Sequence, residues 1–302
     1  MPTPTLLRAA LAGAIAALAA VGAGSAALDA QGAADRQQTV FVSAVDRNGS
    51  PVEDLTVDDV IVREDGRLRE VLSVVRATDP MDVALLVDTS SAAIGSIQDV
   101  RAGVAAFLEA LGDGHRVALV TMDSRPTIVV DYTANRERLM EAADGLFALP
   151  NTSGTRLDAI VEIARGLDQR DTERVAIVPV VFEGGEQTRF YTDDVLAALE
   201  RAGVSLHAVT VGEFVNTGQE PARSLAEVWE RGTRDSGGQR LIVRTANALD
   251  TVMGRLAAEL GAQYRVTFGR PDSLIPPEEL EIETNRADLT LRGNWARGSA
   301  GN

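Results

Sequence analysis

Val83-Ala84-Leu85-Leu86-Val87 is an uninterrupted apolar run that ends at the carboxylate of Asp88. Such a run is typical of a parallel strand that helices cover on both faces. Apolar residues then recur every three or four positions from Ile97 to Leu111, which predicts an amphipathic helix. Residues 83–111 therefore predict one strand–helix unit of an α/β sheet.

The same alternation of strands and helices continues through the middle of the chain. The predicted strands are 117–122, 127–130, 175–182, 204–211 and 241–243, and the predicted helices are 135–145, 155–167, 193–202, one opened by Pro221, and 249–260. This order predicts an α/β fold over residues 81–261, with a doubly wound, Rossmann-like, mostly parallel sheet. In such sheets the functional site lies at the carboxyl ends of the strands.

Both flanks of this region have β character. Residues 38–78 contain short apolar strands and a hairpin signal at Asp65-Gly66, which predicts one returning strand over 68–75. β patterns return in residues 262–293. Three or four strands are too few to bury a core alone. We therefore expect 38–78 and 262–293 to form one small discontinuous β subdomain beside the α/β domain.

The first 27 residues have the three parts of a secretory signal peptide. Arg8 precedes an apolar stretch from Ala9 to Ala23, and small residues follow from Gly24 to Ala27. The sequence thus predicts export to the periplasm or the medium, with no membrane contact beyond this segment. An uncleaved anchor is the alternative, because residues 9–27 are just long enough to span a bilayer.

Composition excludes several classes of function. The chain has no cysteine and no lysine, so it has no disulfide, thiol nucleophile, Schiff base or Walker-type phosphate lysine. Its formal charge is −15, which would repel a phosphate backbone, so nucleic acid is not an expected partner. His115 and His207 are the two histidines and are expected to be structural.

Three loops at predicted strand and helix ends carry oxygen-bearing side chains. They are Asp88-Thr89-Ser90-Ser91-Ala92, Asn151-Thr152-Ser153-Gly154-Thr155 and Glu183-Gly184-Gly185-Glu186. An all-oxygen set suits Mg²⁺ or Ca²⁺ and disfavours zinc. The structural alternative is that Asp88 caps its turn and Thr155 caps the following helix, whether or not metal is bound.

These motifs, in this order, resemble those of a von Willebrand factor type A domain. Residues 52–66 and 259–266 also resemble the leader and ending of a bacterial exported subgroup of that family. The resemblance implies a metal-ion-dependent adhesion site, in which Mg²⁺ is completed by an acidic side chain of a protein partner. Carried over by residue, the implied metal ligands are Asp88, Ser90, Thr155 and Glu183.

The implied site departs from the family pattern at two positions. Ala92 stands where the family has a second serine and offers no oxygen, and Glu183 stands where the family has Asp. Mg²⁺ demands near-octahedral geometry, so a missing ligand must be replaced by water or by a longer side chain. The sequence therefore predicts a degenerate adhesion site.

No catalytic motif is present, so the chain is not expected to be an enzyme. It lacks a Gly-x-Ser-x-Gly elbow, a Ser–His–Asp pattern and a Gly-x-Gly-x-x-Gly turn. A hydrolase using Asp88, Asp123 and Glu183 is the least favoured alternative. Two non-catalytic functions remain: cation-assisted capture of a partner at the top of the domain, and a metal-free structural scaffold.

Overall fold

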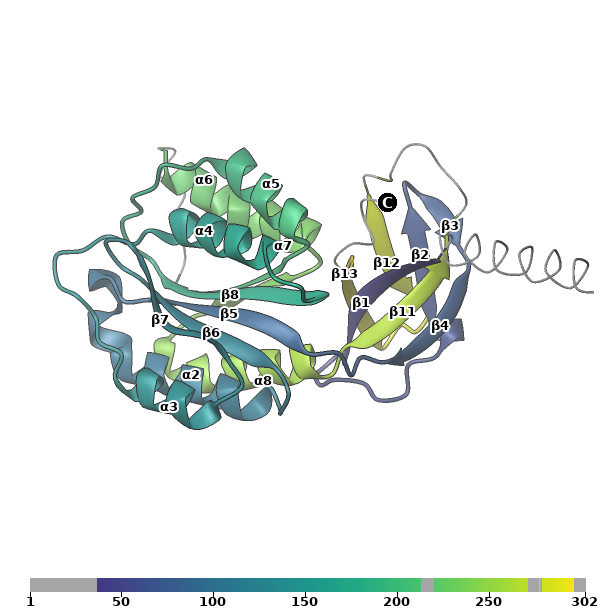
Figure 1. The fold of residues 1–302 in the computed structure, drawn as a ribbon, viewed down its shortest axis with the longest axis horizontal. Coiled ribbons are helices and arrows are strands. Elements are labelled where there is room, and N and C mark those ends of the chain that lie inside the picture. The colour runs from purple at the N-terminus through teal and green to yellow at the C-terminus, as the bar shows by residue number, and fades with distance from the viewer. Residues whose placement is uncertain (1–36, 213–219, 271–276, 278, 296–302) are drawn as a thin grey trace, which may run out of the picture.

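Six strands form the central sheet of the computed structural model. The structure describes residues 37–212, 220–270, 277 and 279–295 (Figure 1). The strands are β5 (Met81–Asp88), β6 (Arg116–Met122), β7 (Pro126–Thr133), β8 (Arg174–Phe182), β9 (Ser205–Val211) and β10 (Gln239–Val243), in the order β10-β9-β8-β5-β6-β7. Only β7 runs antiparallel to its neighbour. The predicted doubly wound, mostly parallel fold is thus confirmed. The predicted signal peptide, residues 1–27, lies outside the described residues.

Helices cover both faces of this sheet. One face carries α2 (Ile97–Ala110), α3 (Arg136–Asp144) and α8 (Leu249–Gly261), and the other carries α4 (Arg156–Asp168), α5 (Thr192–Ala202), α6 (Ala222–Glu227) and α7 (Thr233–Asp235), with the π-helical turn η3 (Val228–Gly232) between the last two (Figure 1). Leu85 and Leu86 of β5 point to opposite cores, and both are fully buried. Burial on both faces explains why β5 reads as a continuous apolar run.

The chain changes direction across the sheet between β5 and β8. From β5 it passes through 3₁₀ helix η2 (Ser91–Ser96) and α2 to β6, and it later returns on the other side of β5 to form β8. The loops after β5 and β8 therefore lie side by side at the carboxyl edge. A crevice at such a switch point is where ligands bind in open α/β sheets.

Strands from both flanks of the chain form two further sheets. One has the order β13-β1-β11-β4 and the other β12-β2-β3. The strands are β1 (Gln37–Asp46), β2 (Val60–Glu64), β3 (Arg67–Arg69), β4 (Val71–Arg76), β11 (Tyr264–Gly269), β12 (Leu280–Thr284) and β13 (Leu289–Trp295), with 3₁₀ helix η1 (Val57–Asp59) before β2. They share one apolar core that includes Val42, Val62 and Phe268. This β unit contains strands from both the N-terminal and the C-terminal flank, as the fold prediction states.

The stretch 68–75 differs from its predicted form. The sequence predicts one returning strand after the Asp65-Gly66 turn, but the structure divides it into β3 and β4 on either side of Glu70. β3 pairs with β2 in the hairpin, whereas β4 pairs with β11 in the other sheet. Strand periodicity is the same in both sheets, so only the pairing partner reveals the division.

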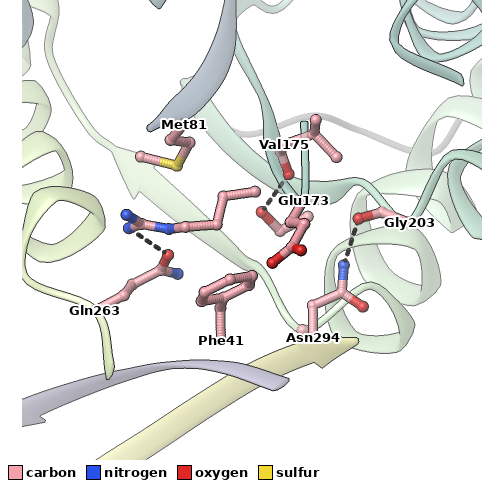
Figure 2. Close-up of a pocket in the computed structure, with 10 residues that line it drawn as sticks. Phe41, Met81, Glu173, Val175, Gly203, Gln263 and Asn294 are labelled. Atoms are coloured by element: carbon pink, nitrogen blue, oxygen red, sulfur yellow. Dashed lines mark hydrogen bonds between the residues drawn. The ribbon is translucent and has the colours of Figure 1, made fainter. Parts of the chain in front are cut away.

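Buried polar contacts join the β unit to the central domain (Figure 2). Arg174 of β8 donates to the Gln263 side chain at 3.1 Å and to the Leu260 carbonyl at 3.1 Å, and Gln263 donates to Ser43 of β1 at 3.2 Å. The cavity beside Arg174 and Gln263 measures about 20 Å³, which is room for one water rather than a ligand. This junction is therefore structural.

Within the described ranges, no helix is both long and apolar enough to cross a membrane.

Candidate functional site

Asp88 lies fully buried at the carboxyl end of β5 and is the centre of the candidate site. Its Oδ1 accepts the backbone N–H of Ser90 at 2.9 Å, which is the turn-capping role expected of a strand-end Asp. Its Oδ2 accepts the backbone N–H of Phe182 at 3.2 Å, across the switch point between β5 and β8. Asp88 thus joins the two strand ends.

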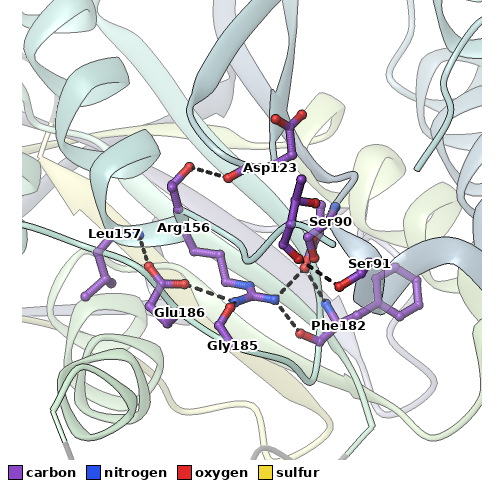
Figure 3. Close-up of polar contacts among 11 residues, drawn as sticks. Ser90, Ser91, Asp123, Arg156, Leu157, Phe182, Gly185 and Glu186 are labelled. Atoms are coloured by element: carbon purple, nitrogen blue, oxygen red, sulfur yellow. Dashed lines mark hydrogen bonds and ion pairs between the residues drawn. The ribbon is translucent and has the colours of Figure 1, made fainter. Parts of the chain in front are cut away.

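A buried arginine completes the surroundings of Asp88. Nη2 of Arg156, in the first turn of α4, donates to Asp88 Oδ2 at 2.7 Å and to the Phe182 carbonyl at 2.9 Å. Nη1 of the same guanidinium donates to the Gly185 carbonyl at 2.9 Å and to Glu186 Oε2 at 3.0 Å (Figure 3). The side chains of Arg156 and Asp88 are both 0% exposed. The cation at the centre of this site is therefore part of the protein.

Glu186 holds the other side of the guanidinium and the start of α4. Its side chain is 1% exposed, and its Oε1 accepts the backbone N–H of Leu157 at 3.1 Å. A carboxylate at a helix N-terminus also interacts favourably with the helix dipole. Burial raises the pKa of Glu186 to about 7, even though Arg156 and the Leu157 N–H both act to lower it. For Arg156, burial disfavours the charge, but Asp88 and Glu186 more than compensate and raise its pKa.

Hydrogen bonds join the three predicted loops at this edge. The Ser91 hydroxyl donates to the Thr152 carbonyl at 2.7 Å, and the Leu149 N–H donates to the Thr89 carbonyl at 2.8 Å. The N–H of Gly154 donates to the Gly185 carbonyl at 3.0 Å. The loop after β5, the loop before α4 and the loop after β8 therefore form one connected surface.

The structure places the four predicted ligands in different surroundings. Asp88 and Ser90 lie together and are buried, but the Thr155 hydroxyl donates to the Asp123 carbonyl at 3.0 Å. Thr155 occupies the N-cap position of α4 without a capping side-chain bond, so the capping expected of it is supplied at Leu157 by Glu186. Glu183 is exposed, and the carboxylate that reaches the centre of the site belongs to Glu186.

This arrangement does not fit a divalent cation. Asp88, the main candidate ligand, is already neutralised by Arg156, and Ala92 supplies no oxygen. Mg²⁺ in proteins is usually held by one or two carboxylates together with water, and here the buried carboxylate is already paired with a guanidinium. Metal binding by Asp88, Ser90, Thr155 and Glu183 stays a prediction, and the surroundings of their side-chain oxygens do not support it.

Arg156 and Glu186 are the site residues that sequence reasoning missed. An arginine in the first turn of a helix ordinarily extends into solvent, so its type and position predict nothing unusual. One signal was available in the sequence. Arg156, a cation, directly follows Thr155 in a chain where Ala92 removes a metal ligand. Glu186 follows the two glycines that come shortly after β8.

The two histidines lie away from this edge. His115 Nδ1 accepts the backbone N–H of Met81 at 3.2 Å near the start of β5, and His207 is buried within β9. Burial lowers the pKa of each imidazole to about 4, so both are neutral near pH 7. Their positions agree with the structural role expected for them.

Comparison with solved structures finds several similar chains. The neighbours include a von Willebrand factor type A protein from Catenulispora acidiphila, with 13% identity, a TM-score of 0.49, and coverage of 86% of this chain and 73% of that one. They also include the conserved hypothetical protein BatB from Bacteroides thetaiotaomicron, with 12% identity, a TM-score of 0.46, and coverage of 60% and 98%. Proximal thread matrix protein 1 from the mussel byssus has 14% identity, a TM-score of 0.49, and coverage of 66% and 50%.

Sequence comparison assigns the family. A search of curated proteins finds no match. The family profile described as von Willebrand factor type A domain matches residues 82–253, which is more than half of the chain and spans β5 to α8. The chain belongs to the von Willebrand factor type A family.

Proposed function

We propose that this protein is an exported, non-catalytic module that binds a protein partner through the loops at the carboxyl edge of its central sheet. Von Willebrand factor type A domains are in general protein-interaction modules, which supports a binding function over a catalytic one. Asp88 is sealed by Arg156, which leaves the hydrolase alternative without its central free carboxylate. Export rests on the signal-peptide pattern of residues 1–27.

The observation that carries this proposal is an exposed apolar side chain close in sequence to each of the three joined loops. Ile94 is 50% exposed after β5, Phe147 is 64% exposed before α4, and Tyr191 is 64% exposed at the start of α5. Large apolar and aromatic side chains on a polar surface are the residues that anchor protein interfaces. The joined loops hold these anchors on a fixed frame, which reduces the entropy lost on binding.

This mode of binding needs no metal-bridged carboxylate. The resemblance implies that Mg²⁺ at Asp88 captures an acidic side chain of the partner, but the guanidinium of Arg156 lies buried against that carboxylate. We propose that contact is made by the exposed anchors instead. The scaffold alternative is favoured by the same closed site, and a partner-binding test distinguishes the two.

The test is affinity capture from the protein's own exported fraction, with a surface variant and a matched control. The variant replaces Ile94, Phe147 and Tyr191 by Ser, and the control replaces Leu68 and Val75 by Ser, two comparably exposed apolar residues of the β unit. We expect partners to be lost with the variant, retained with the control and unaffected by EDTA. If the wild type, the surface variant and the control captured the same partners equally well, the scaffold function would be favoured.

Export has a separate test. Fractionation of cells expressing the full chain should place it outside the cytoplasm, with a new N-terminus near residue 28 if the segment is removed. A chain lacking residues 1–27 should stay in the cytoplasm. Retention of the full chain in the cytoplasm would refute export without bearing on the binding surface.

A further inference from the structure

The guanidinium of Arg156 occupies the centre of a cradle of oxygen atoms. The cradle consists of Asp88 Oδ2, Glu186 Oε2 and the backbone carbonyls of Phe182 and Gly185, all 2.7–3.0 Å from its terminal nitrogens. Carboxylate and carbonyl oxygens are also the donors that Mg²⁺ and Ca²⁺ take in proteins. The structure therefore has a cation-binding arrangement, and its cation is a side chain.

We propose that Arg156 is the permanent, built-in cation of this adhesion-type site, and that it makes the site independent of divalent metal. One positive charge lies between two buried carboxylates from different strand ends, which is the electrostatic task that an ion would perform there. A guanidinium suits this task because its planar fork of N–H groups bonds several oxygens at once and stays charged at any physiological pH.

Small residues around the guanidinium support this assignment. A Cβ added to Gly154 would lie 2.6 Å from the guanidinium carbon, closer than real Cβ contacts allow. A Cβ added to Gly184 would lie 2.9 Å from Ala92 Cβ and 3.5 Å from Nη2 of Arg156. The segments at 154 and 184 are thus shaped to the buried side chain, and Ala92 packs beside Gly184. Ala92, which reads as a lost metal ligand, fits a site that needs no ligand there.

The hydrogen bonds of the Arg156 guanidinium join three segments of the chain. Through Arg156, the end of β5, the first turn of α4 and the loop after β8 are held together without a component that must be bound from solution. The inference concerns the same loops as the proposed binding function but needs no partner. A metal titration therefore tests it separately from any loss of partner binding.

The first measurement is a calorimetric titration of the purified protein with Mg²⁺ and Mn²⁺, with thermal melts in metal and in EDTA. We expect no saturable heat up to about 1 mM metal and the same melting temperature in both, because nothing binds that could add stability. Ala92→Ser should leave both results unchanged. Saturable binding that Asp88→Asn abolishes would overturn the proposal.

The second measurement removes the built-in cation. Arg156→Ala removes the cation that the two carboxylates and two carbonyls share, so this variant should bind Mg²⁺ or Mn²⁺ at least about tenfold more tightly than the wild type and melt higher in metal than in EDTA. Adding Asp88→Asn to Arg156→Ala should remove the gain. The matched control is Arg189→Ala, because Arg189 also pairs with a carboxylate, Asp158, but its side chain is 75% exposed. It should gain no metal binding.

Each outcome decides the proposal. A folded Arg156→Ala variant without metal binding would show that the guanidinium does not occupy a cation site. A variant that folds only when metal is added would support the proposal, because the ion then performs the task of the side chain. If the variant fails to fold in either condition, the wild-type and Asp88→Asn titrations decide, since Asp88-dependent metal binding contradicts a built-in cation and its absence supports one.

Discussion

Replacing Arg156 by Met should destabilise the protein by about 3–5 kcal/mol, the usual loss when one partner of a buried ion pair is removed. The structure supports this magnitude. Two of the four hydrogen bonds of Arg156 go to carboxylates, Asp88 at 2.7 Å and Glu186 at 3.0 Å, and bonds between charged groups contribute roughly 1.5–3 kcal/mol each. Methionine fills similar volume, so the loss reports the charge rather than a cavity.

The assay is urea unfolding followed by circular dichroism, in a double-mutant cycle with Asp88→Asn. The two single variants share one ion pair, so their losses should not add, and the coupling should be about 1–3 kcal/mol. The control is Arg189→Met, because the guanidinium of Arg189 is 75% exposed in its ion pair with Asp158, and this pair should contribute roughly 0–1 kcal/mol. Additive losses within about 0.5 kcal/mol would refute the idea that Asp88 and Arg156 act as a unit.

The pH dependence of this variant follows from Glu186. Burial raises the pKa of that carboxyl to about 7 in the native protein, and loss of the neighbouring cation would raise it further. The folded state then binds more protons than the unfolded state, so stability falls as pH rises. The loss from Arg156→Met should accordingly be larger at pH 8 than at pH 6.

Three further changes test other parts of the structure. Burial lowers the pKa of His207 from 6.5 to about 4. The stability that this neutral imidazole contributes is therefore complete above pH 6.5 and is lost as the pH falls toward 4. Between pH 6.5 and pH 5, the His207→Leu variant should lose about 2 kcal/mol less unfolding free energy than the wild type, measured by urea unfolding. An unchanged pH profile would contradict this assignment. Gly237→Ala would place its Cβ 1.8 Å from the Gly293 carbonyl, whereas Gly66→Ala has a similar positive φ and open space, so the first should lower the melting temperature far more than the second. Tyr264→Phe removes a hydroxyl that donates to Val52 at 2.9 Å and should lower the unfolding free energy by about 1 kcal/mol, with equal stability counting against that bond.

Local sequence patterns predicted most of the fold. The apolar run 83–87 and the helical spacing from Ile97 to Leu111 are properties of neighbouring residues, and β5 and α2 follow them closely. The position of Asp88 at a strand end and its turn-capping bond to Ser90 could be predicted for the same reason. The flanking β unit was predictable as a whole because neither half contains enough strands to bury a core.

Pairing between distant segments decided the rest. Glu183 and Glu186 are both acidic residues after β8, and only the folded chain distinguishes the exposed one from the one that bonds Arg156. The division at Glu70 likewise depends on β3 and β4 having different partner strands. The burial of Arg156 could not be predicted from the sequence, because a charged side chain is buried only where groups of opposite charge pair with it. Here they come from residues 68 positions earlier and 30 positions later, which only the tertiary structure brings together.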